Sequence, residues 1–205
     1  MKSTFQMSDL GLLSFYLGIE VRQGEGAITL HQSTKKILEL AGMADCNSAD
    51  MPMEERLHLS KDSTTEMVNA TEYRPIVGCL SYLVHTRPDI SFTVGFVSRF
   101  MERPTDEHQR TVKRLLRYIG YGLRYEHRAT ATWLIGYSDA DLASDIDTRK
   151  STSGVLFFLG DCLTSWQSVK QKVVALSSCE SEYVATTTAA TQEIWLARLL
   201  GDLLG

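Results

Sequence analysis

Alternating apolar and polar residues open the chain. Residues 13–22 and 27–31 follow this two-residue period, and the turn sequence Gly24-Glu25-Gly26 lies between them. Side chains of a strand point alternately to its two faces. Two such runs joined by a glycine-containing turn therefore predict a β-hairpin.

Helical periods follow the hairpin. A short helix is predicted from a Ser33 or Thr34 cap to the glycine at Gly42, and the polar stretch 45–65 predicts a surface loop. Apolar residues three and four positions apart then predict three consecutive helices within residues 71–119, and Gly78 is expected to allow close packing. Breaks between these helices are predicted at two prolines, Pro88 and Pro104, because proline disfavours helix in the residue before it.

The remaining sequence favours strands and ends in a long helix. Residues 120–132 are rich in glycine and polar side chains and are interpreted as a linker. Aromatic and β-branched residues then predict strands, and a long period of 3.6 residues predicts a helix over 178–200. The expected strands are 133–138, 154–159, 162–168 and 173–176. The pattern as a whole predicts an α+β fold.

Composition is that of an ordinary globular protein. The chain has 205 residues, of which 43% are hydrophobic and 22% charged, enough for one large domain or two small ones. The net charge of -4 gives no global attraction to nucleic acid. Any contact with phosphates must therefore come from a local basic face.

Other features narrow the class of protein. The four cysteines are widely spaced, without a Cys-x-x-Cys pair, and are interpreted as reduced thiols of an intracellular protein. The N-terminal residues lack the apolar core of a signal peptide, and no run approaches the roughly 18 apolar residues of a membrane span. We therefore expect a cytoplasmic or nuclear protein with no membrane partner. The histidines suggest no catalytic triad, and no glycine-rich phosphate loop is found.

Carboxylates gather at two places about forty residues apart. Asp139 and Asp141 follow the predicted strand 133–138, and Glu180 and Glu182 lie in the first turn of the final helix. Mg²⁺ takes oxygen ligands, usually one or two carboxylates with waters and phosphates. The alternatives without a metal are that the aspartates form a polar turn and that the glutamates are favoured by the helix dipole. Because Glu180 and Glu182 are two residues apart, we expect one of them to face the strand.

A basic stripe marks the third of the consecutive helices. Its members are three, four and seven residues apart and lie opposite the apolar stripe: Arg110, Lys113, Arg114 and Arg117. Such a stripe could follow a phosphate backbone. A solvated helix face is the alternative, because amphipathic helices commonly carry basic residues outward.

A series of short motifs runs along nearly the whole chain. The motifs are Met7-Ser8-Asp9-Leu10-Gly11, Tyr16-Leu17-Gly18-Ile19-Glu20-Val21, Tyr73-Arg74, Val77-Gly78, Thr86-Arg87-Pro88-Asp89-Ile90, Ser98-Arg99-Phe100, Gly136-Tyr137-Ser138-Asp139-Ala140-Asp141, Arg149-Lys150-Ser151-Thr152-Ser153-Gly154, Val174-Ala175-Leu176-Ser177-Ser178 and Trp195-Leu196. In this order they resemble the pol polyprotein of copia-type LTR retrotransposons.

The resemblance implies two regions and a metal site. Residues 1–128 resemble the C-terminal, thumb- or connection-like part of a reverse transcriptase, and 129–205 resemble the N-terminal part of a ribonuclease H domain with a mixed sheet. Asp139 is similar to the first metal-binding Asp of that domain and Glu182 to its helix Glu. Glu180 is the less favoured alternative, and Asp141 is expected either to support the metal ligands or to have a structural role. The implied cofactor is Mg²⁺ and the implied partner an RNA–DNA hybrid.

Departures from the family pattern limit the expected activity. The paired polymerase aspartates are not found in this sequence, so we expect no primer extension. The sequence also ends before the later ribonuclease H aspartates, so little or no turnover is expected of this truncated stretch alone. Leu142 and Ser144 stand where the family usually has Trp and Gly.

A noncatalytic role is the alternative hypothesis. A ribonuclease H fold fragment with an unpaired sheet edge would expose backbone groups that favour pairing with another strand. The chain would then be a binding or interaction module derived from a retrotransposon. Its partner would be nucleic acid, a second copy of itself or the rest of the polyprotein.

Overall fold

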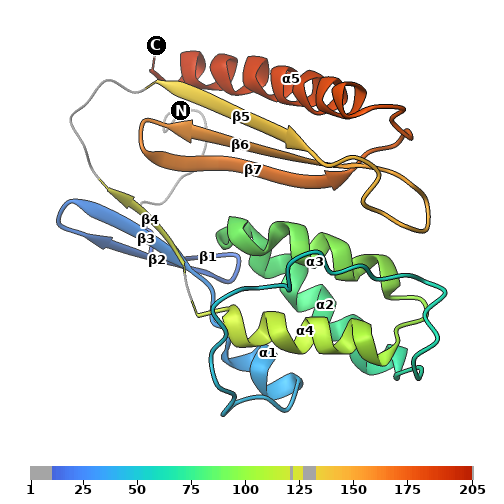
Figure 1. Cartoon of the computed structure of the whole chain (residues 1–205). Helices are drawn as coiled ribbons and strands as arrows, with labels where there is room; N and C mark the ends of the chain where they lie inside the picture. Colours follow the sequence, from blue (N-terminus) through green and yellow to red (C-terminus); the bar gives the residue numbers. More distant parts are fainter. Residues whose placement is uncertain (1–10, 121, 127–132, 205) are drawn as a thin grey trace, which may run out of the picture.

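The computed structural model describes residues 11–120, 122–126 and 133–204. Two antiparallel sheets and several helices make up this part of the chain, so the predicted α+β class is confirmed (Figure 1). Motif residues 7–10 and linker residues 127–132, with the expected domain boundary, lie outside it. Within the described part, no helix is long and apolar enough to cross a membrane.

The first sheet contains the predicted hairpin and one strand that was not predicted. Its order is β1 (Phe15–Tyr16), β2 (Ile19–Gly24), β3 (Ala27–His31) and β4 (Leu123–Glu126). Leu17 and Gly18 have φ of 46° and 80° and form a turn that divides the predicted strand 13–22 in two.

The expected linker 120–132 is therefore partly wrong, because β4 pairs with β3. A Cβ at Gly122 would lie 2.9 Å from the Leu30 carbonyl oxygen. This glycine thus allows the returning chain to approach β3.

Helices fill the middle of the chain. They are α1 (Lys35–Leu40), α2 (Ala70–Leu83), α3 (Ser91–Val97) and α4 (Asp106–Tyr118), with 3₁₀ turns η1 (Val84–Thr86), η2 (Pro88–Ile90) and η3 (Ser98–Phe100). Their apolar stripes meet in a core that includes the fully buried Val77, Leu80 and Leu115. The expected role of Gly78 is wrong, since nothing lies within 4 Å of a Cβ placed there.

The second sheet has the order β5 (Leu134–Ala140), β6 (Thr152–Leu159) and β7 (Cys162–Lys170). Its strand pairs are all antiparallel, so the expected mixed sheet is not found among the described residues. The predicted strand 173–176 is an irregular segment instead. Helix α5 (Ser178–Leu204) is confirmed and extends slightly beyond its predicted end.

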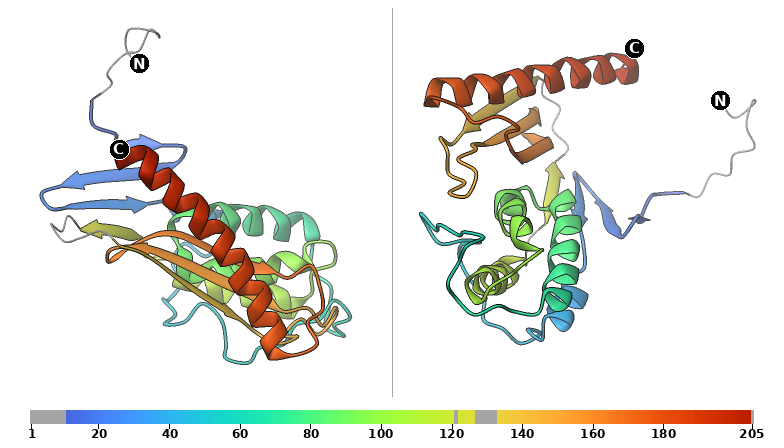
Figure 2. Two further views of the ribbon diagram at one scale, coloured as in Figure 1. Left: turned by 90° about the horizontal axis from the view of Figure 1, so that it is seen from above. Right: turned by 90° about the vertical axis from the view of Figure 1, so that its right-hand side faces the viewer.

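The second sheet lies between two layers of helix. Helix α5 packs on β5 and β6 across one face, while α3 approaches β7 from the other (Figures 1 and 2). Both the long helix and the helical middle of the chain can therefore contribute residues to sites around β5.

Candidate functional site

Asp139 lies next to the last residue of β5. Its neighbour Ser138 faces α5, with its hydroxyl 3.4 Å from that of Thr186. Because strand side chains alternate, Asp139 points to the opposite face, toward α3. Its side chain is exposed and lines a cavity of about 760 Å³ between the sheet and the helical part.

Glu182 reaches the same strand end from α5. Its Oε1 accepts a hydrogen bond of 3.2 Å from the backbone N–H of Ala140, the residue after Asp139. Glu180 turns away, and its Oε2 accepts a 2.7 Å bond from the N–H of Leu176. The expectation that one of the two glutamates faces the strand is confirmed, and the residue is Glu182.

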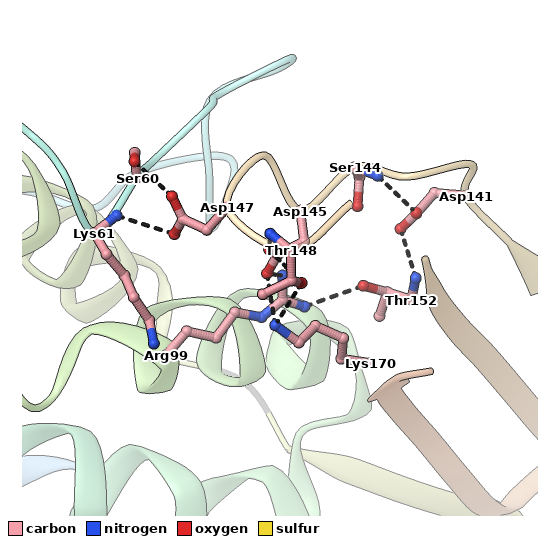
Figure 3. Close-up of polar contacts among 10 residues, drawn as sticks. All are labelled: Ser60, Lys61, Arg99, Asp141, Ser144, Asp145, Asp147, Thr148, Thr152 and Lys170. Carbon is pink, nitrogen blue, oxygen red and sulfur yellow. Dashed lines mark hydrogen bonds and ion pairs between the residues drawn. The ribbon is translucent and has the colours of Figure 1, made fainter. Parts of the chain in front are cut away.

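Asp141 organises the loop that leaves β5. Its two carboxylate oxygens accept bonds from the N–H groups of Ser144, at 3.2 Å, and Thr152, at 3.1 Å (Figure 3). The carboxylate thus closes the loop 141–151 onto the start of β6. This contact agrees with the structural role expected of Asp141.

Asp145 in the same loop is more deeply buried than the predicted site residues. Its carboxylate binds the side chains of Arg99, Lys170 and Thr148 (Figure 3). Burial alone would raise the pKa of Asp145, but hydrogen bonds from Lys170 and Thr148 outweigh it and hold that pKa well below its ordinary value. Asp145 is therefore a charged, fully engaged carboxylate and not a free ligand.

The cavity beside Asp139 has an aromatic and acidic lining. Its lining includes Phe92 of α3, Tyr137 and Trp166 of the sheet, and the carboxylates Asp89, Asp139 and Asp141. The Asp89 carboxylate is held by Arg87 through bonds of 2.8 and 2.6 Å. The Thr86-Arg87-Pro88-Asp89 motif is thus part of the structural frame of this cavity, with Arg87 also stacked over the Tyr118 ring.

The donor types at the strand end suit Mg²⁺, but their number is small. Asp139 and Glu182 provide carboxylate oxygens, the ligands that Mg²⁺ prefers. They approach the end of β5 from opposite faces. No group of three or more His, Cys, Asp or Glu side chains that could hold a metal is found in the described residues. The donor types alone therefore suit magnesium, whereas the number of carboxylates and their opposite directions leave the site incomplete as the side chains lie.

The basic stripe forms one wall of a separate cavity of about 420 Å³ that α4 shares with Glu54 and Leu57. Two of its arginines are already paired. Arg110 lies 2.5 Å from the Asp106 carboxylate, and Arg114 lies 3.2 Å from that of Glu54. Lys113 and Arg117 are exposed and form no salt bridge within the described residues.

Sequence reasoning missed Asp145 and Arg99, which join the two halves of the chain. The Asp-x-x-Thr spacing of Asp145 and Thr148 is a local signal for a capped turn. Nothing local could have paired Asp145 with Arg99, because 46 positions separate them.

Comparison with known proteins places the chain in a family. A family model described as "Reverse transcriptase (RNA-dependent DNA polymerase)" matches residues 1–55. The Retrovirus-related Pol polyprotein from transposon RE1 of Arabidopsis thaliana is 39% identical over 97% of this chain and 14% of its own length. The corresponding polyprotein from transposon TNT 1-94 of Nicotiana tabacum is 38% identical over 99% of this chain and 16% of its own.

A shorter relative covers a similar stretch. The uncharacterized mitochondrial protein AtMg00810 of Arabidopsis thaliana is 37% identical over 95% of this chain and 83% of its own length. No solved structure matches the chain. The chain belongs to the family of retrovirus-related Pol polyproteins of copia-type transposons. It spans about one seventh of the length of the transposon polyproteins that it matches.

Proposed function

We propose that the chain is the segment of a Pol polyprotein in which a reverse transcriptase region passes into a ribonuclease H domain. Residues 1–128 would be the C-terminal, thumb- or connection-like region and 129–205 the first part of the ribonuclease H domain. The reverse transcriptase match at residues 1–55 supports the first assignment. The succession of three antiparallel strands and one long helix, with the motif at Asp139, supports the second.

The function proposed for the second region is hydrolysis of the RNA strand of an RNA–DNA hybrid. The observation that carries it is the hydrogen bond from the Ala140 N–H to Glu182, because it holds the first turn of α5 against the strand end that bears Asp139. In this proposal Asp139 and Glu182 together bind Mg²⁺. The ion would activate water and stabilise the leaving oxygen.

Each carboxylate contributes differently to this arrangement. One carboxylate oxygen of Glu182 accepts the Ala140 N–H, and this bond fixes the orientation of the side chain. The other oxygen remains available for an ion. Asp139 is exposed on the cavity side of the sheet, where a phosphate of the substrate could approach. Since two carboxylates form a partial set, we expect weak ion binding and little or no cleavage from these 205 residues alone.

The basic face of α4 is proposed to contact the phosphates of the same hybrid. Lys113 and Arg117 are the better candidates, because Arg110 and Arg114 are engaged by carboxylates. A phosphate could still compete for these two arginines, since Arg110 is largely exposed and Glu54, the partner of Arg114, is exposed as well.

Cleavage by a longer Pol polypeptide that contains this segment tests the proposal. A labelled RNA–DNA hybrid should be cut in the presence of Mg²⁺, and Asp139→Asn or Glu182→Gln should abolish the cut. The matched control is Glu180→Gln, which removes a carboxylate from the same helix turn and should retain most activity. Full cleavage by the Asp139→Asn protein would show that the site is assigned wrongly.

A noncatalytic interaction module is the second candidate. Among the described strands, β5 pairs with β6 alone, so its other edge can accept a strand. A small cavity of about 320 Å³, lined by Leu134, Leu159, Trp195 and Leu199, lies between the sheet and α5. Self-association through β5 would give a concentration-dependent dimer on size exclusion with light scattering. Ile135→Lys, on β5, should then restore the monomer.

A further inference from the structure

The loop 141–151 and the helical part of the chain meet at a polar junction, which Figure 3 shows. We use "junction" for the contacts that Arg99, Ser60 and Lys61 make with this loop and with the start of β6. Arg99 belongs to η3, which continues α3, whereas Ser60 and Lys61 lie in the long loop before α2. The junction therefore joins residues that are far apart in the sequence.

Asp145 is at the centre of the junction. Its Oδ2 lies 2.9 Å from Arg99 Nη1 and 2.9 Å from Lys170 Nζ. Its Oδ1 accepts bonds of 2.7 Å from both the backbone N–H and the hydroxyl of Thr148. The Asp145 side chain is 6% exposed and that of Arg99 is 12% exposed. Water cannot easily replace these contacts, so the ion pair has one well-defined geometry.

Other hydrogen bonds connect the same two parts of the chain. Arg99 Nη2 donates to the Thr152 hydroxyl at 3.0 Å, so one guanidinium binds both the loop and β6. Asp147 accepts bonds from the Ser60 hydroxyl, at 2.6 Å, and from the Lys61 N–H, at 3.0 Å. Outside the junction, the Trp166 indole of β7 donates to the Val84 carbonyl at 3.0 Å and adds a further bond between the sheet and the helical part.

The junction is connected to the candidate metal site through the loop 141–151. The loop begins at Asp141, two residues after Asp139, and Asp141 accepts a bond from the N–H of the same Thr152 that Arg99 binds. A displacement of Arg99 relative to the loop would therefore act on the end of β5. On the other side, α3 packs against α4, the helix with the basic stripe.

We propose that Asp145 is a positioning residue that fixes the sheet and α5 to the helical part, and so sets the distance between the strand end at Asp139 and the basic face of α4. The roles of these two surfaces rest on the proposed function. The inference of a fixed arrangement rests on the contacts described above and not on that function. A hybrid bound along α4 would then meet Asp139 at a constant spacing.

Double electron–electron resonance, which measures the distance between two spin labels, tests the arrangement directly. Spin labels are placed on the exposed positions Lys113 of α4 and Ala190 of α5, in a full chain whose four native cysteines are replaced by serine. The parent chain should give a single narrow distance distribution. Asp145→Asn and Arg99→Gln should each abolish that narrow peak, while circular dichroism retains the helical signal.

Two matched variants separate the junction from the loop. Thr148→Val removes the hydroxyl that binds Asp145 and Lys170 within the sheet unit and leaves Arg99 in place, so the narrow peak should remain. Arg99→Lys retains a cation beside Asp145 and should restore much of the peak that is absent in Arg99→Gln. If Asp145→Asn fails to fold, Arg99→Gln on the other side of the junction decides the result.

The opposite results would overturn the proposal. A narrow peak in both Asp145→Asn and Arg99→Gln means that other contacts fix the two parts. Equal broadening in Thr148→Val means that Asp145 acts within its own loop. In a longer Pol polypeptide that cleaves hybrid, Arg99→Gln should reduce cleavage, and unchanged cleavage would overturn the positioning role. Absence of cleavage by the parent polypeptide would instead count against the proposed function, while the distance result would stand.

Discussion

At the scale of single residues, two glycines that lie within regular elements differ in the space around them. A Cβ at Gly136 of β5 would lie 2.6 Å from the ring of Phe157, whereas one at Gly78 of α2 would meet nothing within 4 Å. Gly136→Ala should therefore lower the free energy of unfolding by about 1–3 kcal/mol. Gly78→Ala should raise it by about 0.5–1 kcal/mol, because alanine favours an exposed helix position. Urea unfolding of both variants measures the contrast, and effects of the same sign would contradict it.

His108 gives the stability of the protein a pH dependence. Its Nδ1 accepts the backbone N–H of Thr105 at the start of α4, and its ring stacks on Phe100. Burial lowers the pKa of His108 and outweighs the opposing effects of Glu107, the Ser60 carbonyl and Asp147. The folded state then binds the proton less tightly than the unfolded state, whose pKa is near 6.5. Stability should be constant above that value and fall as the pH drops below it.

The variant His108→Gln tests this pH dependence. Glutamine at the third helical position can still accept the Thr105 N–H in a capping box, but it does not titrate. The decrease in unfolding free energy between about pH 7.5 and pH 5.5, a range that spans the unfolded-state pKa, should therefore be smaller in His108→Gln than in the parent. The exposed His58→Gln variant is the control and should keep the parental slope. An unchanged slope in His108→Gln would assign the pH dependence to other groups.

At the scale of elements, the basic helix α4 can be tested through the salt dependence of binding. If its stripe contacts a hybrid, Arg114→Gln together with Arg117→Gln should weaken binding to every sequence alike. The slope of log affinity against log salt should fall by about 1 for each phosphate that the variant no longer neutralises. Fluorescence anisotropy at several salt concentrations measures both effects. The control is Arg124→Gln, which changes an arginine of β4 instead. A parental salt slope in the double variant would favour the alternative that the stripe is only a solvated helix face.

Elements with local signals were predictable, and those that depend on distant partners were not. The β2–β3 hairpin and α5 follow from periodicity and turn residues that lie within each element. The local sequence of β4 predicts a linker, because its four residues become a strand only by pairing with β3, almost a hundred positions earlier. Residues 173–176 have strand-like side chains but no neighbouring strand to pair with in the described sheet.

The candidate site divides in the same way. Sequence motifs indicate Asp139 and Glu182, and the contact of Glu182 with the Ala140 amide brings their elements together. Sequence could not show that Asp139 faces away from α5, because this depends on the register of β5 against β6. Nor could it find the Arg99–Asp145 pair, which exists only where the two halves of the chain meet.

At the scale of the whole molecule, the helical part of the chain and the sheet with α5 are joined through α3, β7 and the junction. The helical part has the core around Leu80 and Leu115, and the sheet and α5 bury Phe157 and Ala185. Each part thus has buried apolar side chains of its own. The contacts of Asp145 and Arg99 between them should therefore decide whether the two parts unfold together or separately.

Calorimetry of the Arg99→Gln chain tests this coupling. The parent should unfold in one transition, whereas Arg99→Gln leaves Asp145 with Lys170 as its remaining cation and should separate the transition into two. Because Lys170 and Thr148 still engage the Asp145 carboxylate, the loss should stay below the roughly 3–5 kcal/mol of a buried ion pair whose remaining charge has no partner. It should appear as a lower midpoint for the less stable part. Burial raises the pKa of Asp145, but hydrogen bonds from Lys170 and Thr148 outweigh this effect and hold that pKa below its ordinary value. The coupling should therefore persist above about pH 4 and weaken only at lower pH. Arg198→Gln, the same substitution at an exposed position of α5, is the control. A single unshifted transition in Arg99→Gln would mean that the apolar contact of α3 with β7 joins the two parts without the ion pair.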